Sequence, residues 1–256
     1  LWQGHAPLLF PYCGRLFGNV LRAHGKEYPA PIHGFARQAR FECEHADDDS
    51  AAFLLKSNAK TRAIYPYDFE LRVEYSLQGP VFCQMVTARN PGQPGGGVLP
   101  FSVGFHPGFA LADGADAPEW ELVFEEPESP RIVHTPGGYV SGEESVLFEG
   151  KKVLPLADDI FAGDSLCLQG LRSNTITLRP RGDENPKQGV KVGIEGFDNV
   201  LLLGPPQGPL PFVCIEPWHG LPAGPQEAED SEQKPHHEQL VGGQSWKTKL
   251  EIEILG

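Results

Sequence analysis

The chain contains 256 residues and has a formal net charge of −13, from 21 Lys and Arg residues against 34 Asp and Glu residues. This acidic balance excludes a protein that binds a nucleic-acid backbone, because such binding needs a concentrated positive field. No apolar stretch reaches the roughly 18 residues of a membrane span, and no signal peptide is apparent. The 5 cysteines are widely spaced and contain no Cys-x-x-Cys pair. We therefore expect neither a disulfide framework nor a bound metal, and we expect a cytoplasmic protein.

Short strands joined by turns dominate the predicted structure. Glycine (30 residues) and proline (25 residues) are abundant, yet 40% of the chain is hydrophobic, which is enough for a packed core. Alternating apolar and polar residues predict half-buried strands, because successive side chains of a strand point to opposite faces. In chain order, these predicted strands span residues 69–77, 119–124, 190–194 and 249–254.

Other segments are predicted to be fully buried strands or loops. Continuously apolar runs, typical of strands buried on both faces, span residues 81–87, 200–203 and 212–215. Predicted loops are the acidic run 42–49, the glycine run 95–97 and the proline-rich stretch 222–239. Patterns of alternating strand and helix are absent, which disfavours a βαβ fold. We therefore predict an all-β antiparallel sandwich that forms one domain over residues 1–256.

Three cationic or titratable residues interrupt the strand pattern beside glycine or proline. Arg15 follows a glycine after an apolar run, where its guanidinium could hold the hydroxyl groups of a ligand. His33 precedes a glycine, which lets the backbone turn and present the imidazole. His106 lies between aromatic residues, and an imidazole can donate or accept a proton near neutral pH. A surface arginine, an exposed loop histidine and a hydrogen-bonded core histidine are the ordinary alternatives.

Glu216 is the most informative residue, because it lies within the apolar run Phe212–Trp218. Glutamate is rarely buried unless it is paired. Desolvation would raise its pKa toward the range that suits a base at neutral pH. The alternative is an exposed glutamate at a strand end before Pro217. Trp218 favours a pocket, as a stacking platform for a ring-shaped ligand or as a core aromatic.

These segments, in this order, resemble the aldose 1-epimerase (galactose mutarotase) family. The branch concerned carries the motifs Leu-Phe-Pro…Gly-Arg, His-Gly-Phe-Ala-Arg, Tyr-Pro-x-x-Phe, Gly-x-His-Pro-x-Phe and Cys-Ile-Glu-Pro-Trp. In this chain the motifs occupy residues 9–15, 33–37, 65–69, 104–109 and 214–218. The resemblance runs nearly end to end but lacks the N-terminal strands that members usually have, so we expect this chain to be without them.

The resemblance implies a large antiparallel β-sandwich, the galactose mutarotase-like supersandwich, with the site in a cleft on one sheet. It implies that Glu216 is the general base and His106 the general acid of anomer interconversion, on opposite sides of the sugar. It matches Arg15 and His33 to sugar-contacting positions. The implied reaction moves only protons, so no cofactor or metal is expected, and the expected partner is a small-molecule sugar.

Several assignments stay open at the level of sequence. Asp164 is the candidate for a hydroxyl-binding aspartate, with Asp158 and Asp159 as competitors, and all three also fit an ordinary turn. Arg37 would suit a phosphate, so a hexose-6-phosphate mutarotase is the nearest alternative. A non-catalytic carbohydrate-binding module is the alternative from another class, because such folds host both binding and catalysis. The chain is expected to be a monomer or a homodimer.

Overall fold

Two compact units of antiparallel strands make up the protein in the computed structural model, which describes residues 5–111, 119–225 and 230–256. Unit 1 contains residues 105–218 and 252–256 with the start of the chain, and unit 2 contains residues 8–104 and 219–251. The prediction of an all-β antiparallel fold is confirmed. Single-domain organisation stays a prediction. None of the helices in the described ranges has the length and apolar character needed to cross a membrane.

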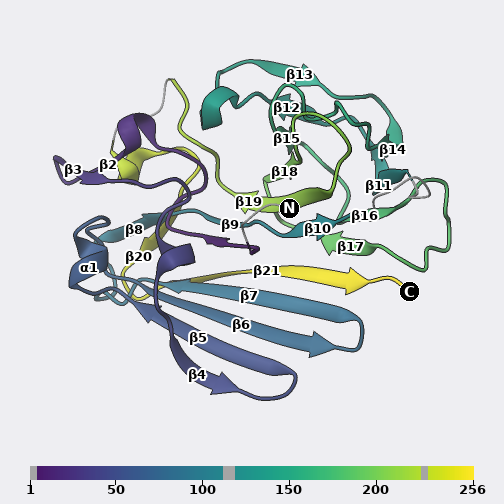
Figure 1. The fold of residues 1–256 in the computed structure, drawn as a ribbon. Coiled ribbons are helices and arrows are strands. Elements are labelled where there is room, and N and C mark those ends of the chain that lie inside the picture. Colours follow the sequence, from purple (N-terminus) through teal and green to yellow (C-terminus); the bar gives the residue numbers. More distant parts are fainter. Residues whose placement is uncertain (1–4, 112–118, 226–229) are drawn as a thin grey trace. The chain divides into compact units, whose positions relative to one another are not determined.

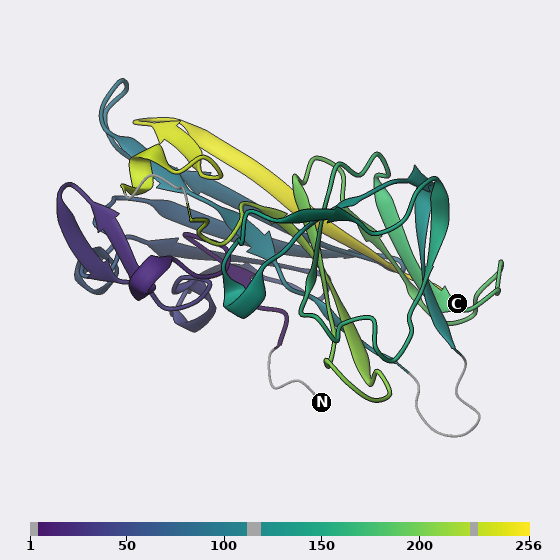
Figure 2. The same cartoon turned by 90° about the horizontal axis from the view of Figure 1, so that it is seen from above.

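An antiparallel meander forms the largest part of unit 2. Strands β4 (Glu42–Ala46), β5 (Ser50–Lys56), β6 (Glu70–Gln78) and β7 (Val81–Arg89) pair in sequence order. The C-terminal strand β21 (Ser245–Ile254) lies beside β7 (Figure 1). Figure 2 shows the same yellow strand running along the blue strands of the meander. The predicted alternation of residues 69–77 is observed in the first part of β6, where Leu71 and Val73 are buried, but not at its end, where Leu77 is 52% exposed.

Short strands and single helical turns complete unit 2. Strands β2 (Val20–Ala23) and β3 (Lys26–Pro29) form a hairpin whose loop residues His24 and Gly25 both have positive φ angles, 53° and 71°. Two positive φ angles are what a type I′ hairpin turn requires. The other elements are β1 (Leu8–Leu9), β8 (Val98–Phe101), β9 (Val103–Phe105), β20 (Glu238–Val241), α1 (Ala59–Arg62), η1 (Phe17–Asn19), η2 (Ala36–Gln38) and η4 (Ser231–Gln233).

An aromatic cluster forms the core of unit 2. The Phe10 ring lies 5.2 Å from the Phe69 ring, 5.9 Å from the Phe101 ring and 6.1 Å from the rings of Phe35 and Tyr65, measured between centroids. The buried Tyr65 hydroxyl donates a hydrogen bond to the Pro100 carbonyl at 2.6 Å. Aromatic pairs at these separations stabilise a core beyond their buried area. Three of the sequence motifs, at residues 9–15, 33–37 and 65–69, therefore supply side chains to one core.

Two antiparallel sheets form unit 1. One has the order β19-β18-β15-β12-β13, with β10 also pairing with β19, and the other contains the order β14-β11-β16-β17. The strands of the first sheet are β10 (Gly108–Ala110), β12 (Arg131–Val133), β13 (Glu144–Val146), β15 (Leu166–Gln169), β18 (Asn199–Leu203) and β19 (Phe212–His219). The second contains β11 (Trp120–Glu128), β14 (Lys151–Pro155), β16 (Thr175–Pro180) and β17 (Val190–Gly193), and η3 (Pro136–Gly138) is a separate turn. Strands β18 and β19 are buried on both faces, as their continuous apolar runs predict.

Three local predictions are wrong. The acidic run 42–49, predicted as a loop, begins with the exposed strand β4, which ends the sheet order of unit 2. Charged side chains are common on edge strands, where they discourage further pairing. The run 81–87 is not buried on both faces, because β7 buries only alternate residues from Gln84 onward. Residues 222–224, predicted as exposed loop, are buried, and the Ala223 N–H donates to the Arg15 carbonyl at 2.8 Å.

Replacing Gly34 with alanine should destabilise the protein severely. Gly34 has a φ of 71°, and a Cβ at this position would lie 2.1 Å from the Phe10 carbonyl oxygen. Gly25 is the matched control, since it has the same φ of 71° with nothing within 4 Å of its Cβ position. We expect Gly25→Ala to lower the free energy of unfolding by about 1–2 kcal/mol and Gly34→Ala by about 4 kcal/mol or more. Urea unfolding of both variants would measure this, and equal losses would contradict the role of the close approach.

Candidate functional site

Strand β19 places Glu216 inside unit 1. Glu216 is only 1% exposed, and its partner across the strand pair is Leu201 of β18. Because side chains alternate along a strand, Cys214, Glu216 and Trp218 share one face of β19. Cys167 of β15 occupies the next position in the same cross-strand row, opposite Leu201. The expected burial of Glu216 is therefore observed, and the alternative of an exposed glutamate is excluded.

His106 reaches Glu216 because the segment around it is bonded to β19 on both sides. On one side, the Trp218 indole N–H donates to the Phe105 carbonyl at 3.2 Å. On the other side, the Ile215 N–H donates to the Pro107 carbonyl at 3.3 Å, and Gly108 of β10 is in register with Cys214. His106 Nε2 consequently lies 3.3 Å from Glu216 Oε2. A buried carboxylate and a buried imidazole thus meet in direct contact.

Burial controls the protonation of the groups around Glu216. Desolvation raises the pKa of Glu216 well above its ordinary value of 4.5, and interaction with Trp218 opposes this shift. Burial also raises the pKa of the Cys167 thiol to about 12 and raises that of the Cys214 thiol, with the negative charge of Glu216 adding to both. A carboxyl group with a raised pKa is a stronger base, once ionised, than an exposed glutamate.

Glu216 and His106 are in contact at 3.3 Å, and their placement on opposite sides of a bound sugar stays a prediction. The pairing offsets part of the cost of burying the carboxylate. The chemistry does not need opposite sides. The hydroxyl oxygen and the ring oxygen of a cyclic sugar are both bonded to C1, so a base and an acid that lie together can address both.

In unit 2, two hydrogen bonds join His33 to Gly14, the residue before Arg15. The Gly14 N–H donates to His33 Nδ1 at 3.0 Å, and the His33 N–H donates to the Gly14 carbonyl at 2.8 Å. Because Nδ1 accepts, the proton of a neutral His33 ring is on Nε2. Gly14 and His33 have positive φ angles of 75° and 64°. A glycine adopts such an angle without strain, whereas His33 is strained. The motifs at 9–15 and 33–37 are therefore one structural feature.

The other predicted site residues differ in their surroundings. Arg37 is exposed on η2 in unit 2. Asp164 is exposed in a turn of unit 1, where its Oδ1 accepts from the Ser165 N–H at 2.7 Å, and the competing Asp158 and Asp159 are also exposed. Trp218 is 2% exposed and holds the Phe105 carbonyl, so its observed contacts are those of a residue that positions the His106 segment.

Cys214 is the residue that sequence reasoning missed. Its Sγ and single ligand atoms from His106 and Glu216 all lie within 4.8 Å of one another, and all three residues are buried. These are atom types that bind transition metals. The sequence carried a signal for two of these three residues, because Cys214 and Glu216 are two apart in a strand and share a face. Nothing local indicated that His106 would join them.

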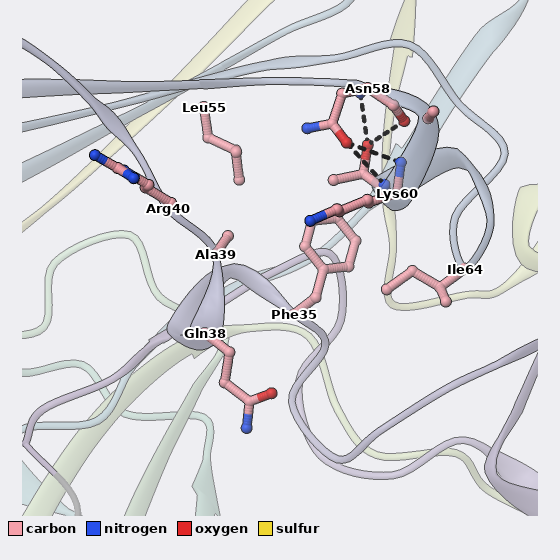
Figure 3. Close-up of a pocket in the computed structure, with 10 residues that line it drawn as sticks. Phe35, Gln38, Ala39, Arg40, Leu55, Asn58, Lys60 and Ile64 are labelled. Carbon is pink, nitrogen blue, oxygen red and sulfur yellow. Dashed lines mark hydrogen bonds between the residues drawn. The ribbon is translucent and has the colours of Figure 1, made fainter.

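A separate cavity of about 630 Å³ lies in unit 2. Phe35, Leu55 and Ile64 supply apolar lining, and Figure 3 shows Phe35 and Leu55 between η2 and α1, with Arg40 extending away from them. Within the described residues, the lining of this cavity contains neither a carboxylate nor an imidazole. The cavity therefore offers no acid–base pair, and the candidate catalytic centre is the Glu216–His106 contact.

Comparison with known proteins adds independent information. A family model described as Aldose 1-epimerase matches residues 2–128. The chain is 31% identical over 264 aligned positions to Protein LacX, chromosomal, of Lactococcus lactis subsp. lactis, covering 99% of this chain and 86% of that protein.

Solved structures are similar over the whole chain. The structure of a galactose mutarotase related enzyme from Lactobacillus acidophilus has a TM-score of 0.88 and 31% identity, and the match covers 100% of this chain and 84% of that one. A galactose mutarotase-like protein from Lactobacillus casei has a TM-score of 0.86 and 25% identity, with 99% and 86% covered. Both similarities extend across unit 1 and unit 2 alike.

Replacing Glu216 with glutamine should stabilise the fold increasingly as the pH rises. Since burial raises the pKa of Glu216 above 4.5, the native protein retains a proton that the unfolded chain releases above that value. Wild-type stability therefore falls as the pH rises from about 4.5 through the raised native pKa, by up to about 1.4 kcal/mol per pH unit, and glutamine abolishes this loss. Urea unfolding at pH 5 and pH 8 should show a difference between the variant and wild type that widens at pH 8. The exposed Glu149→Gln is the control, and a difference for Glu216→Gln that is independent of pH would contradict the argument.

Proposed function

We propose that this chain, which belongs to the aldose 1-epimerase family, interconverts the α and β anomers of a hexose by acid–base ring opening and closure. The observation that carries the proposal is the buried contact between Glu216 Oε2 and His106 Nε2 at 3.3 Å. Family membership supports a sugar as the substrate. The buried pair supplies the two kinds of group that the reaction needs, one to accept a proton and one to donate a proton.

The proposed reaction begins with ionised Glu216 and protonated His106. Glu216 removes the proton from the C1 hydroxyl while His106 protonates the ring oxygen, and the C1–O ring bond breaks to give the open-chain aldehyde. Rotation about the C1–C2 bond presents the other face of the aldehyde. The ring oxygen then attacks C1, His106 recovers its proton, and Glu216 returns its proton to the C1 oxygen. Every proton is restored, so the enzyme ends as it began.

The environment of Glu216 suits this role. A base works best when its pKa is near the working pH, and desolvation moves the pKa of Glu216 upward from 4.5 in that direction. The reaction moves protons only and requires no change of oxidation state or group transfer. We therefore infer that it needs no cofactor.

We also propose sugar-binding roles for residues outside the pair. Arg15 and His33 are matched by the family motifs to sugar-contacting positions, and their shared turn around Gly14 supports a common role. Arg37 and Asp164 are further candidates, because both side chains are exposed and can hydrogen-bond hydroxyl or phosphate groups. Trp218 is a further candidate, as a stacking platform for the sugar ring. Its indole N–H also donates a hydrogen bond to the Phe105 carbonyl.

Loss of either member of the pair should nearly abolish anomerisation. Positioned acid or base groups contribute about 10²- to 10⁴-fold each, so Glu216→Gln and His106→Asn should lower kcat by factors in that range. Polarimetry with α-galactose, α-glucose and glucose 6-phosphate would measure the rates and would also identify the preferred sugar. Glu149→Gln is the control for removal of a carboxylate elsewhere. A folded Glu216→Gln variant with a near wild-type rate would remove Glu216 from the proposed role, and sugar binding without any rate in wild type would indicate a binding module.

Changes at Arg15 and His33 should weaken binding more than chemistry. If these side chains hold sugar hydroxyls equally in the ground state and the transition state, Arg15→Gln and His33→Gln should raise KM by about tenfold with little change in kcat. Arg22→Gln is a matched control in unit 2, since Arg22 is paired with Glu27 at 2.9 Å. An unchanged KM in both variants would exclude them as sugar contacts.

A further inference from the structure

We propose that His106, Cys214 and Glu216 form a binding site for a thiophilic divalent cation of the Zn²⁺ type. The three residues come from two segments of unit 1, the strand β19 and the turn that precedes β10. The site shares the imidazole and the carboxylate with the proposed reaction and adds the Cys214 thiol. Cys214 has no part in that reaction, and it is the residue that would make the cluster a metal site.

The geometry is close to that of a tetrahedral metal centre. The three ligand atoms lie within 4.8 Å of one another, and the imidazole nitrogen and carboxylate oxygen are 3.3 Å apart. Zinc bonds of about 2.0–2.3 Å place neighbouring ligand atoms roughly 3.3–3.8 Å apart in a tetrahedron. The nitrogen–oxygen separation already fits, and movement of a thiol by about 1 Å would complete the set.

The backbone holds the ligands in this arrangement independently of any ion. Cys214 and Glu216 are two residues apart on β19, and Gly108 is in register with Cys214. The hydrogen bonds from Trp218 to the Phe105 carbonyl and from Ile215 to the Pro107 carbonyl enclose His106 between them. A site on rigid strands loses little entropy when an ion binds.

Charge balance favours a divalent ion. Glu216 Oε2 is buried and has no hydrogen-bond partner among the described residues, although it lies beside His106 Nε2. Buried carboxylates are costly without charge compensation, and an ion at this position would add a positive charge beside the His106 contact. When the ion binds, the Cys214 thiol and the Glu216–His106 pair each release one proton to solvent, and a metal–sulfur bond forms. One carboxylate and one thiolate then neutralise the two positive charges, so no net charge is buried.

The ligand types determine the class of ion. Thiolate and imidazole select zinc-like transition metals, whereas Mg²⁺ and Ca²⁺ prefer six or more oxygen ligands. Three protein ligands leave a fourth tetrahedral position for water or a sugar hydroxyl. One consequence rests on the proposed function: the bound cation should inhibit anomerisation. It would occupy the Glu216 oxygen and the His106 nitrogen that move protons.

Cobalt substitution tests the site without using activity. Co²⁺ bound to a thiolate gives a sulfur-to-metal charge-transfer absorption in the near ultraviolet, which oxygen and nitrogen ligands do not produce. Titration should be done in a background with Cys43→Ser and Cys83→Ser, because Cys43 is exposed and Cys83 is partly exposed. We expect one Co²⁺ per chain with the thiolate band, displaced by Zn²⁺.

Cys214→Ser and Cys167→Ser form the decisive pair of variants. Both cysteines are buried and both are influenced by the charge of Glu216, but only Cys214 belongs to the cluster. Loss of groups that merely support a metal ligand lowers affinity by about 10- to 100-fold, so loss of the Cys214 thiolate should cost at least as much. The charge-transfer band should vanish in Cys214→Ser and persist in Cys167→Ser. Cys214→Ala, with folding checked by circular dichroism, guards against a local effect of the serine hydroxyl.

The outcomes separate this proposal from the proposed function. A band that persists in Cys214→Ser, or no uptake of Co²⁺ by the background protein, would overturn the metal site whatever the enzyme's activity. A band that depends on Cys214 in a protein without anomerase activity would support the metal site and contradict the catalytic proposal. If both proposals hold, Zn²⁺ should inhibit anomerisation in the background protein, and Cys214→Ser should weaken that inhibition by at least about tenfold.

Discussion

The burial of the Glu216 carboxylate is the constraint on which unit 1 depends. A carboxylate that is 1% exposed destabilises the fold unless it is protonated, paired with a cation or hydrogen-bonded. The surroundings of Glu216 reduce this cost. Its pKa rises, His106 contacts it, and Trp218 holds the backbone beside His106. The same burial underlies the two roles proposed for Glu216, as a base and as a ligand for a cation.

In unit 2, aromatic packing and backbone hydrogen bonds hold short irregular segments in fixed positions. The motif residues there divide into two kinds. Phe10, Phe35, Tyr65 and Phe69 pack into the aromatic core, whereas Arg15 and His33 belong to the turn around Gly14. Gly34 permits the close approach to the Phe10 carbonyl that joins these segments. The motif residues of unit 2 therefore build its core as well as the turn around Gly14.

Sequence patterns located seven strands among the described residues but not the neighbours of those strands. Alternation identified β6, β11, β17 and β21, because side-chain direction along a strand is a local property. The same reasoning misassigned residues 42–46 and 222–224, since exposure depends on what packs against a segment. Strand β4 stays a strand because β5 offers it hydrogen bonds, and its acidic side chains need only solvent on the open side.

The sequence by itself determined which side chains can carry acid–base chemistry, that the fold is built from antiparallel strands, and that the motifs resemble those of one family. Only the tertiary structure decided that His106 contacts Glu216 and that Cys214 joins them. The reason is that residues 106 and 216 are far apart in the chain. Their meeting depends on the register between β10 and β19 and on hydrogen bonds across it, which no local pattern of residues encodes.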